Sequence, residues 1–474
     1  VMSGSGSISS ATGYYTAASG LGATTEVVSV MDSLGNTSSV TFPVARMRRL
    51  AGAVGAAGSY TNFCSVSDSG AVKCWGSQSY GELGQGNAAS VGTSAGQMGA
   101  NLARVNLGVN RTVYEITGGS QSYCALSDTG LPVCWGRNQE GQLGIGDTMT
   151  RGNAVPHMGN NLVAVDLGTN RTVRALSAGA YFNCAISDLN KVYCWGYNAA
   201  GQLGRANGVT SSFGDSAGEM GNNFTYASLG INRTALSIAS GDDFTCVITD
   251  IGGTKCWGQN SSGALGYGDA SNRGTTGVSM GDSLPVVNLG TNRTARQISA
   301  ANASACAVLD DYKLKCWGGN TFGNSGYGDA ATRGNAANQM GNNLPTVNLG
   351  TNRNVIRLST GGENACAILD NGQLKCWGYN NGTSPNTAGQ LGYGDSITRG
   401  DSPGEMGDSL PYVNLGTNRT AKSVLVKGST CVVLDNNSIK CFGYNSGGQL
   451  GQGDMQSRGI LSGQMGENLP AIDL

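Results

Sequence analysis

The stretch Cys184 to Gly204, CAISDLNKVYCWGYNAAGQLG, decides the fold, because seven versions of it contain all fourteen cysteines and all six tryptophans of the chain. Its two cysteines lie ten residues apart and flank an Asp-x-Asn triplet that starts at Asp188. Asp-x-Gly and Asp-x-Asn triplets suit a type I turn followed by a residue in the left-handed region, which is typical of a short hairpin loop. The segment is therefore predicted to fold back on itself and to place Cys184 directly opposite Cys194.

The other six copies keep this spacing, and directly opposed residues of an antiparallel pair have a Cα separation that a disulfide accepts. Only Asp310-Asp311-Tyr312 breaks the turn pattern, and Phe442 replaces tryptophan in the seventh copy. Because side chains alternate along a strand, the ring should point to the opposite face from the sulfur. The expected disulfides are Cys64 with Cys74, Cys124 with Cys134, Cys184 with Cys194, Cys246 with Cys256, Cys306 with Cys316, Cys366 with Cys376 and Cys431 with Cys441.

Two alternatives compete with disulfides. Reduced cysteines can serve as small core residues, and cysteines can also bind zinc. A ten-residue spacing is not that of a zinc knuckle, and the one histidine, His157, occurs in a single repeat. Fourteen regularly paired cysteines favour disulfides and an oxidising compartment. We expect an extracellular, secreted protein with no metal and no cofactor.

The first cysteines step from Cys64 by 60, 60, 62, 60, 60 and 65 residues. Each repeat offers four short strand candidates, which for the third are 173–178, 183–187, 191–195 and 162–167. Four short strands repeated seven times predict an all-β, seven-bladed β-propeller with a disulfide-stapled hairpin in each blade. We place the propeller at residues 44–474, with repeats that start near 44, 111, 172, 234, 294, 354 and 420.

A connector of about 30 residues follows each Trp strand and carries two recurring features. Seven Met-Gly pairs are expected to fill gaps between blades. An Asp-Arg pair is expected to tether the loop to itself, which argues against calcium because the arginine stands where a ligand would be needed. Repeats one and three depart from the pattern, with Asn87 and with RANGVTSSFGD. The pairs are Asp147 with Arg151, Asp269 with Arg273, Asp329 with Arg333, Asp395 with Arg399 and Asp454 with Arg458.

Residues 1–43 lie outside the repeat and include two β-prone stretches, Thr25 to Met31 and Ser38 to Val44. This N-terminal extension is interpreted either as a tail that docks one strand on its own domain or as a strand donated to a neighbouring molecule. At the other end, the last strand candidate stops at Leu474, and how the ring closes there is left open.

Composition narrows the function classes. Glycine accounts for 77 of 474 residues and charged residues for 12%, with a net charge of −1. Such a surface gives no electrostatic reason to expect nucleic acid or membrane insertion. Gly-Asp-Ser-Leu, a motif of some esterases, occurs at 281–284 and 407–410. One histidine cannot serve two triad-like sites, and other repeats carry different residues there, so we expect no enzyme.

Asn-x-Ser/Thr sequons are frequent, and five of them occupy the same inter-blade turn, so they count as one feature that has been copied. We expect these turns to carry N-glycans if the source is eukaryotic. Copies in the inter-blade turn are Asn110, Asn170, Asn232, Asn292 and Asn418, and the others are Asn36, Asn223, Asn260, Asn302, Asn381 and Asn436.

The combination of Cys-Ala-Ile/Leu-x-Asp, Cys-Trp-Gly-x-Asn and Gly-Gln-Leu-Gly-x-Gly-Asp resembles the regulator of chromosome condensation repeat family. The most specific copies are WGRNQEGQLGIGD from Trp135 and WGYNAAGQLG from Trp195, and the resemblance covers residues 50 to 474. It implies a seven-bladed propeller. Two departures are Phe442 in place of tryptophan and Asn324-Ser325 in place of Gln-Leu.

The nuclear member of that family binds chromatin and exchanges nucleotide on a small GTPase, and this chain matches that role poorly because it lacks a basic tail and has paired cysteines. It is more similar to the secreted, cysteine-paired branch, which includes a bacterial propeller that inhibits β-lactamases. A fold does not transfer a partner, so both functions stay open. The histidine common before the family's second strand is replaced by Phe63, Tyr123, Asn183, Thr245, Ala305, Ala365 and Thr430.

We therefore expect a non-enzymatic structural or recognition propeller that self-associates into an extracellular assembly or filament. Its partner would be a protein, such as a second copy, or else a glycan. The alternative function is a lectin-like or enzyme-inhibitor module that binds through the connector loops.

Overall fold

The structure is a computed structural model. It describes residues 61–205, 209–381 and 388–474, together with the backbone of five strands before residue 54. These strands are β1 (Ser7–Ile8), β2 (Tyr15–Thr16), β3 (Thr25–Met31), β4 (Thr37–Pro43) and β5 (Leu50–Ala53). The two β-prone stretches of the N-terminal extension form β3 and β4, which pair with each other as a two-stranded antiparallel sheet.

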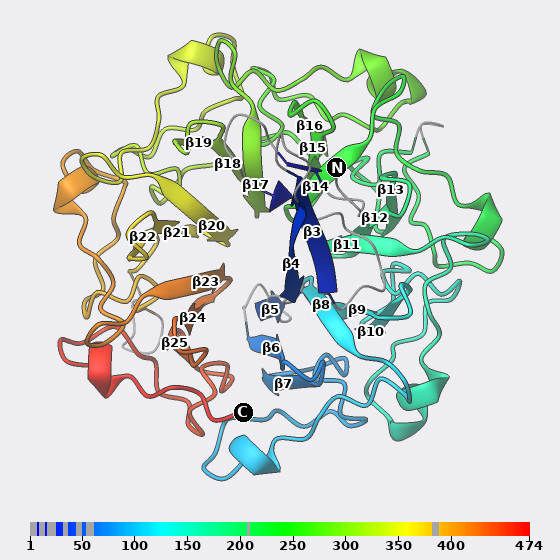
Figure 1. Cartoon of the computed structure of the whole chain (residues 1–474), viewed down its shortest axis with the longest axis horizontal. Helices are drawn as coiled ribbons and strands as arrows, with labels where there is room; N and C mark the ends of the chain where they lie inside the picture. The colour runs from blue at the N-terminus through cyan, green and yellow to red at the C-terminus, as the bar shows by residue number, and fades with distance from the viewer. Residues whose placement is uncertain are drawn as a thin grey trace.

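Seven three-stranded antiparallel sheets stand around a common axis, with the first strand of each sheet innermost (Figure 1). This arrangement confirms the all-β, seven-bladed propeller. The blades are β5 with β6 (Asn62–Val66) and β7 (Val72–Gly76); β8 (Val113–Gly118), β9 (Ser122–Ser127) and β10 (Pro132–Gly136); β11 (Val173–Ala178), β12 (Phe182–Ser187) and β13 (Val192–Gly196); β14 (Ala235–Ser240), β15 (Phe244–Thr249) and β16 (Thr254–Gly258); β17 (Ala295–Ala301), β18 (Ser304–Leu309) and β19 (Leu314–Gly318); β20 (Val355–Gly361), β21 (Asn364–Leu369) and β22 (Leu374–Gly378); and β23 (Ala421–Val426), β24 (Ser429–Leu434) and β25 (Ile439–Gly443).

The prediction of a fourth strand in each blade is wrong. The candidate at 162–167 lies beside β10, where Ala164 forms only an isolated bridge with Val133 and Val165 N donates to Pro132 O at 2.8 Å. The carbonyl of the next residue, Asp166 O, accepts a hydrogen bond from Gly221 N of the following connector at 2.9 Å. The segment therefore links two blades instead of widening one sheet.

The same bonds close the ring. Ile472 N, near the end of the last segment, donates to Ile439 O of its own blade at 2.7 Å. The next carbonyl, Asp473 O, accepts Gly99 N of the first blade's connector at 3.0 Å. The junction between the seventh and first blades is thus built like the other junctions.

In every blade, the two cysteines of the hairpin are directly opposed in the strand register and bonded, with Cα atoms 4.0 to 4.1 Å apart. This is the pairing that the ten-residue spacing predicts. The bonded pairs are Cys64 with Cys74, Cys124 with Cys134, Cys184 with Cys194, Cys246 with Cys256, Cys306 with Cys316, Cys366 with Cys376 and Cys431 with Cys441.

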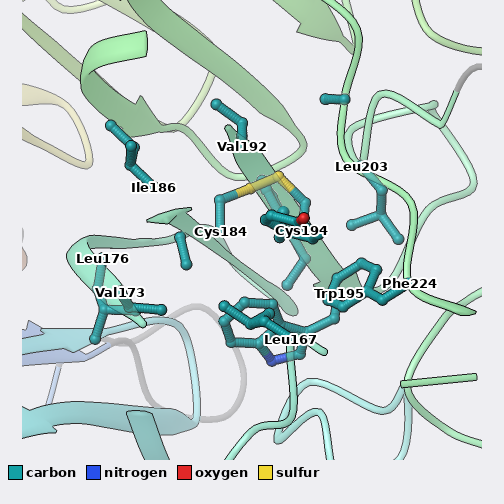
Figure 2. Close-up of a cluster of buried hydrophobic side chains, with 14 of the residues drawn as sticks. Leu167, Val173, Leu176, Cys184, Ile186, Val192, Cys194, Trp195, Leu203 and Phe224 are labelled. Carbon is teal, nitrogen blue, oxygen red and sulfur yellow. A yellow bond between two sulfur atoms is a disulfide. The ribbon is translucent and has the colours of Figure 1, made fainter. Parts of the chain in front are cut away.

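The third blade shows how sulfur and ring are placed. Cys184 of β12 and Cys194 of β13 form the yellow bond in Figure 2. Cys184 Sγ lies 3.7 Å from Thr245 Oγ1 of the next blade, whereas Trp195 Nε1 donates to Gln142 O of the preceding blade at 3.0 Å. Sulfur and ring therefore point to opposite faces, as predicted.

Each junction packs the disulfide of one blade in the same core as the tryptophan of the next, for example Cys124 and Cys134 with Trp195. The indole is fully buried, and its N–H needs an acceptor. The carbonyl comes from the Gly-x-Leu-Gly loop of the preceding blade, or from its Gly-Asn-Ser-Gly variant in the fifth blade, at 2.8 to 3.0 Å in all six cases. The second glycine of the loop, such as Gly84, has a positive φ and leaves no room for a Cβ beside the indole.

The methionines occupy the same junctions. The terminal methyl of Met158 lies 3.1 Å from the position that a Cβ on Gly84 would take, next to Trp135 of the same blade as the methionine. Equivalent methionines approach the corresponding glycines at other junctions, such as Met340 at Gly266. The predicted role of the Met-Gly pairs as fillers between blades is confirmed.

The seventh blade shows how the junction tolerates phenylalanine. Phe442 has no N–H, and the carbonyl that an indole would bind, Gln390 O, accepts Thr430 Oγ1 at 2.8 Å instead. Thr430 lies directly opposite Phe442 in the sheet. In the fourth blade, Thr245 is opposite Trp257, and both donate to Gln202 O.

A pair of matched substitutions tests this junction. Trp317→Phe leaves the buried carbonyl of Ala264 without its indole donor, whereas Trp257→Phe leaves Gln202 O bonded to Thr245. We expect Trp317→Phe to lower the free energy of unfolding by about 1 to 2 kcal/mol more than Trp257→Phe, because an unmade buried hydrogen bond costs about that much. Denaturant unfolding of both variants measures the difference.

A rescue provides the control. Ala305 lies opposite Trp317, as Thr245 lies opposite Trp257, so Ala305→Thr should restore part of the loss in the Trp317→Phe background. An equal loss of unfolding free energy in both tryptophan variants, or no rescue by Ala305→Thr, would show that the indole N–H hydrogen bond adds no stability beyond that of packing.

Candidate functional site

The disc has two distinct faces. The Asp-x-Gly turns contact the inter-blade turns, as when Asp188 N donates to Thr172 O at 2.8 Å. The first-to-second strand turns contact the start of the connectors on the other side, as when Tyr197 N donates to Tyr181 O at 2.9 Å. We call these the turn face and the connector face.

The asparagines of the inter-blade turns have a conformational reason to recur. All five sequon copies are exposed and have φ between 57° and 59°, a left-handed conformation in which Asn is among the few favoured residues. Asn352 has the same φ of 58° in a copy of the turn that carries no sequon. The turn geometry therefore accounts for the repeated Asn, and glycosylation there stays a prediction.

The remaining sequons differ in access. Asn260 is fully buried, and its Nδ2 donates to Asp269 O at 2.8 Å, so the fold has no room for a glycan at this predicted site. Asn36 lies outside the described residues. The side chains of Asn223, Asn302, Asn381 and Asn436 are exposed.

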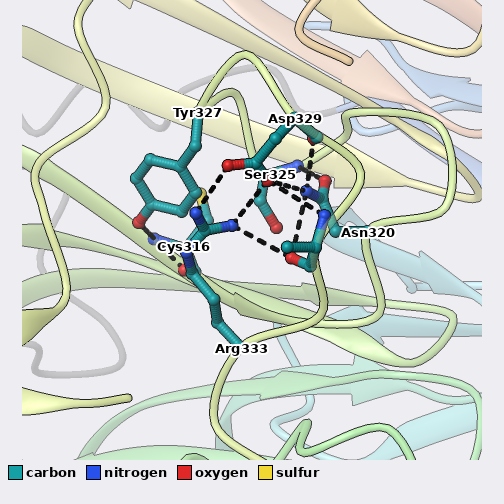
Figure 3. Close-up of polar contacts among 7 residues, drawn as sticks. Cys316, Asn320, Ser325, Tyr327, Asp329 and Arg333 are labelled. Carbon is teal, nitrogen blue, oxygen red and sulfur yellow. Dashed lines mark hydrogen bonds and ion pairs between the residues drawn. The ribbon is translucent and has the colours of Figure 1, made fainter. Parts of the chain in front are cut away.

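The connector loops are held by polar contacts within each loop, as Figure 3 shows for the fifth blade. Arg333 forms an ion pair with Asp329 at 2.7 Å and lies 4.4 Å over the ring of Tyr327. The Tyr327 hydroxyl donates to Cys316 O and accepts from Cys316 N, and burial raises its pKa. The five predicted Asp-Arg pairs are confirmed.

In the third blade, the aromatic and the cationic residue have exchanged places. Phe213 occupies the position of the arginine, since it bridges Gly196 as Arg273 bridges Gly258. Arg205 occupies the position of the tyrosine, and its guanidinium lies 3.8 Å from the ring centroid of Phe213. The departure noticed in the sequence therefore preserves a cation–π contact.

Four buried lysines were missed by the sequence analysis. Each precedes the second cysteine of its blade and donates through Nζ to two backbone carbonyls, as Lys315 does to Leu289 O and Gly341 O at 2.9 and 2.8 Å. Burial lowers the pKa of these groups. The recurring Lys-Cys-Trp or Lys-Cys-Phe triplet is the sequence signal from which a structural role for these lysines could have been predicted. The four are Lys255, Lys315, Lys375 and Lys440.

Several side chains that vary from blade to blade lie close together on the connector face. Two variable positions flank the Asn of the Trp-Gly-x-Asn motif, and neighbouring blades bring them together. At the first junction, the guanidinium of Arg137 lies 5.8 Å from the ring of Tyr80 and 4.6 Å from that of Tyr181. At the fifth, Phe322 and Tyr379 pack edge to face at 4.7 Å.

On this face, backbone hydrogen bonds join the first-to-second strand turns of the second to fifth blades. Ala180 N donates to Asp242 O at 2.9 Å, and Asp242 N donates to Asn302 O at 3.1 Å. Burial raises the pKa of Asp242, and the positive charge of Lys427 in the seventh blade opposes that change. Burial, with the neighbouring Asp242, raises the pKa of Asp243 to about 6.

Reactive groups are sparse. Among residues 61–205, 209–381 and 388–474, no three His, Cys, Asp or Glu side chains converge in a way that could hold a metal ion. His157 Nδ1 lies 2.8 Å from Asn153 Oδ1. In the described part of the chain, no helix has the length and apolar character needed to cross a membrane.

Comparisons with known proteins agree with this geometry. Models of the regulator of chromosome condensation repeat match residues 134–186, 173–202, 236–264 and 355–382. The chain thus carries repeats that match the regulator of chromosome condensation type. It is 27% identical over 333 residues to the Ultraviolet-B receptor UVR8 of Arabidopsis thaliana, covering 69% of this chain and 64% of that protein.

A probable E3 ubiquitin-protein ligase, HERC6 of Homo sapiens, is 30% identical over 205 residues, which is 43% of this chain and 18% of the ligase. The chain thus spans under two thirds of these relatives. Among solved structures, Prp20p of Saccharomyces cerevisiae has a TM-score of 0.58 and human WBSCR16 one of 0.57, at 17% and 16% identity. They cover 78% and 84% of this chain and align over 79% and 88% of their own chains, which supports the fold.

The pKa of Asp243 predicts a pH dependence. The folded pKa of about 6 lies above the ordinary value of 3.8, so the folded state binds the proton more tightly than the unfolded state does. Stability should therefore fall as the pH rises from about 4 to 6. Asp243→Asn should flatten this part of the curve of melting temperature against pH.

Asp250 gives the opposite control. The hydrogen bond from Thr234 N lowers its pKa, so its contribution is lost as the pH falls below 3.8, and Asp250→Asn should change the slope of the curve only there. If Asp243→Asn leaves the curve above pH 4 unchanged, burial does not raise the pKa of this carboxyl in the folded protein.

Proposed function

We propose that this chain is a secreted, non-enzymatic recognition propeller that binds a protein partner on its connector face. The main support for this proposal is the difference between side chains that recur from blade to blade and side chains that vary. The disulfides, tryptophans and Asp-Arg pairs recur as scaffold, whereas Tyr80, Arg137, Tyr181 and Phe322 each occur once at their repeat positions and lie on a single face. Tyrosine and arginine are enriched among the residues that dominate protein interfaces.

The geometry of the first junction suits such a role. The Arg137 guanidinium is fixed by Gln121 Oε1 at 3.1 Å and by Gln139 Oε1 at 2.9 Å, with Tyr80 and Tyr181 within cation–π distance. A side chain held in place before binding loses less conformational entropy on association. The cluster is therefore a preorganised, half-exposed anchor for a partner.

Two further observations support the class of protein. The cysteines are almost fully buried and all bonded, and such frameworks persist in oxidising compartments. The relatives' names point to binding roles, since one is a receptor and the study of Prp20p concerns its binding to Gsp1p and histones. Those partners belong to those proteins.

Capture from the extracellular fluid of the source organism tests the proposal. We expect the native protein in that fluid, with no thiol alkylated before reduction, and we expect the wild-type protein to capture a defined partner that Tyr80→Ala with Tyr181→Ala fails to hold. The control is Ile231→Ala with Ile251→Ala, two exposed side chains on the turn face. Recovery of a reduced protein from the cytosol, or loss of the partner only in the turn-face variant, would contradict the proposal.

Self-association is a second candidate, and the N-terminal hairpin favours it. β3 and β4 pair over seven residues and form a two-stranded sheet of their own, so each strand has an edge that can add to another sheet. A two-stranded hairpin is marginally stable alone, which gives it a reason to pair with a neighbouring molecule.

Light scattering tests self-association. The full chain should form particles larger than one disc, and deletion of residues 1–43 should reduce them to monomers, because the donated edges are removed. Circular dichroism must show an intact propeller in the truncated chain. A full chain that is monomeric throughout, or a truncated chain of unchanged particle size, would refute assembly through the extension.

A further inference from the structure

A cavity of about 460 Å³ opens on the connector face between the fifth and sixth blades. Phe322 comes from the fifth connector, and Tyr379 follows β22 of the sixth blade. Their rings meet at 66° with centroids 4.7 Å apart, and both side chains are half-exposed. The remaining lining includes Ile397, Asp401 and Glu405. The cavity thus has aromatic and acidic walls.

The charge of the cavity is not balanced by its own residues. Asp401 is half-exposed and has no hydrogen bond or ion pair among the residues the structure describes. Glu405 Oε2 accepts backbone bonds from Gly400 and Ser402 at 2.8 and 3.0 Å. Within the described ranges, no lysine or arginine lines the cavity. The neighbouring Arg399 is already paired with Asp395 at 2.7 Å.

The chain itself shows which group satisfies an aromatic ring beside a carboxylate. In three connectors, an arginine lies over a tyrosine ring at 4.4 to 5.4 Å while its guanidinium pairs with an aspartate. At the first junction, Arg137 occupies the position that corresponds to Tyr379, and its guanidinium faces Tyr80 at the position of Phe322. The cavity at the fifth junction offers the ring and the carboxylate without the cation.

We propose that this cavity receives an arginine side chain of the protein partner. The guanidinium would lie against the exposed part of the Tyr379 and Phe322 rings and pair with the Asp401 carboxylate, with Glu405 adding negative potential. The inference rests on the proposed function and names the chemistry of the partner at one point of the same face.

Calorimetric titration with a short peptide tests the pairing on the purified chain. The probe is acetyl-Gly-Arg-Gly-amide, and the comparison is the same peptide with citrulline, which keeps the shape of arginine without the charge. We expect the arginine peptide to bind and the citrulline peptide to bind at least about threefold more weakly, the size of an exposed cation–π contact. Asp401→Asn and Tyr379→Ala should each weaken the arginine peptide by a similar factor.

Asp311→Asn is the matched control, because it removes an exposed carboxylate from the turn face, and it should leave binding unchanged. Melting temperatures confirm that the variants are folded. Equal affinity for both peptides, an effect of Asp311→Asn as large as that of Asp401→Asn, or displacement by neutral oligosaccharides would overturn the inference. Because the titration needs no captured partner, it can fail while the connector-face capture succeeds, and the reverse also holds.

Discussion

The contact on which the rest of the propeller depends is the insertion of a tryptophan from one blade between the disulfide and the loop of the blade before it. The indole is removed from water, so its N–H must find an acceptor inside the protein. The Gly-x-Leu-Gly loop presents a carbonyl, and a glycine in the left-handed region lets the ring approach the backbone. Each blade is therefore completed by its neighbour, as in other repeat proteins whose stability resides in interfaces between units.

Much of this could be predicted from local spacing. The cysteine pairs, the turns and the Asp-Arg tethers all join residues within about ten positions of each other, where strand register and turn geometry leave few alternatives. The fourth strand was mispredicted because the segment makes only an isolated bridge to β10, while Asp166 O bonds to Gly221 N, 55 residues away. The hydrophobic pattern alone does not reveal such a bond to the following connector.

The missed features have a related cause. A lysine next to a buried cysteine is ordinarily expected at the surface, yet Lys315 is buried because two connector carbonyls meet its ammonium group. The exchange of Arg205 and Phe213 was visible only as a missing aspartate, since the sequence does not show that residues eight apart stack. The recurrent Asn of the inter-blade turns was instead interpreted in the sequence as part of a glycosylation signal. Its left-handed backbone conformation is by itself enough to explain why it recurs.

The hairpin disulfides have a mechanical consequence. In each blade, the bond joins residues ten apart, so a pulling force transmitted along the chain passes through the sulfurs and bypasses the turn between them. Under tension, the junctions between blades can separate while every disulfide-closed hairpin keeps its length. The length to which the unfolded chain can be stretched is therefore reduced at seven places. Reduction would lengthen the same molecule under load, which makes the redox state of the surroundings a determinant of its compliance.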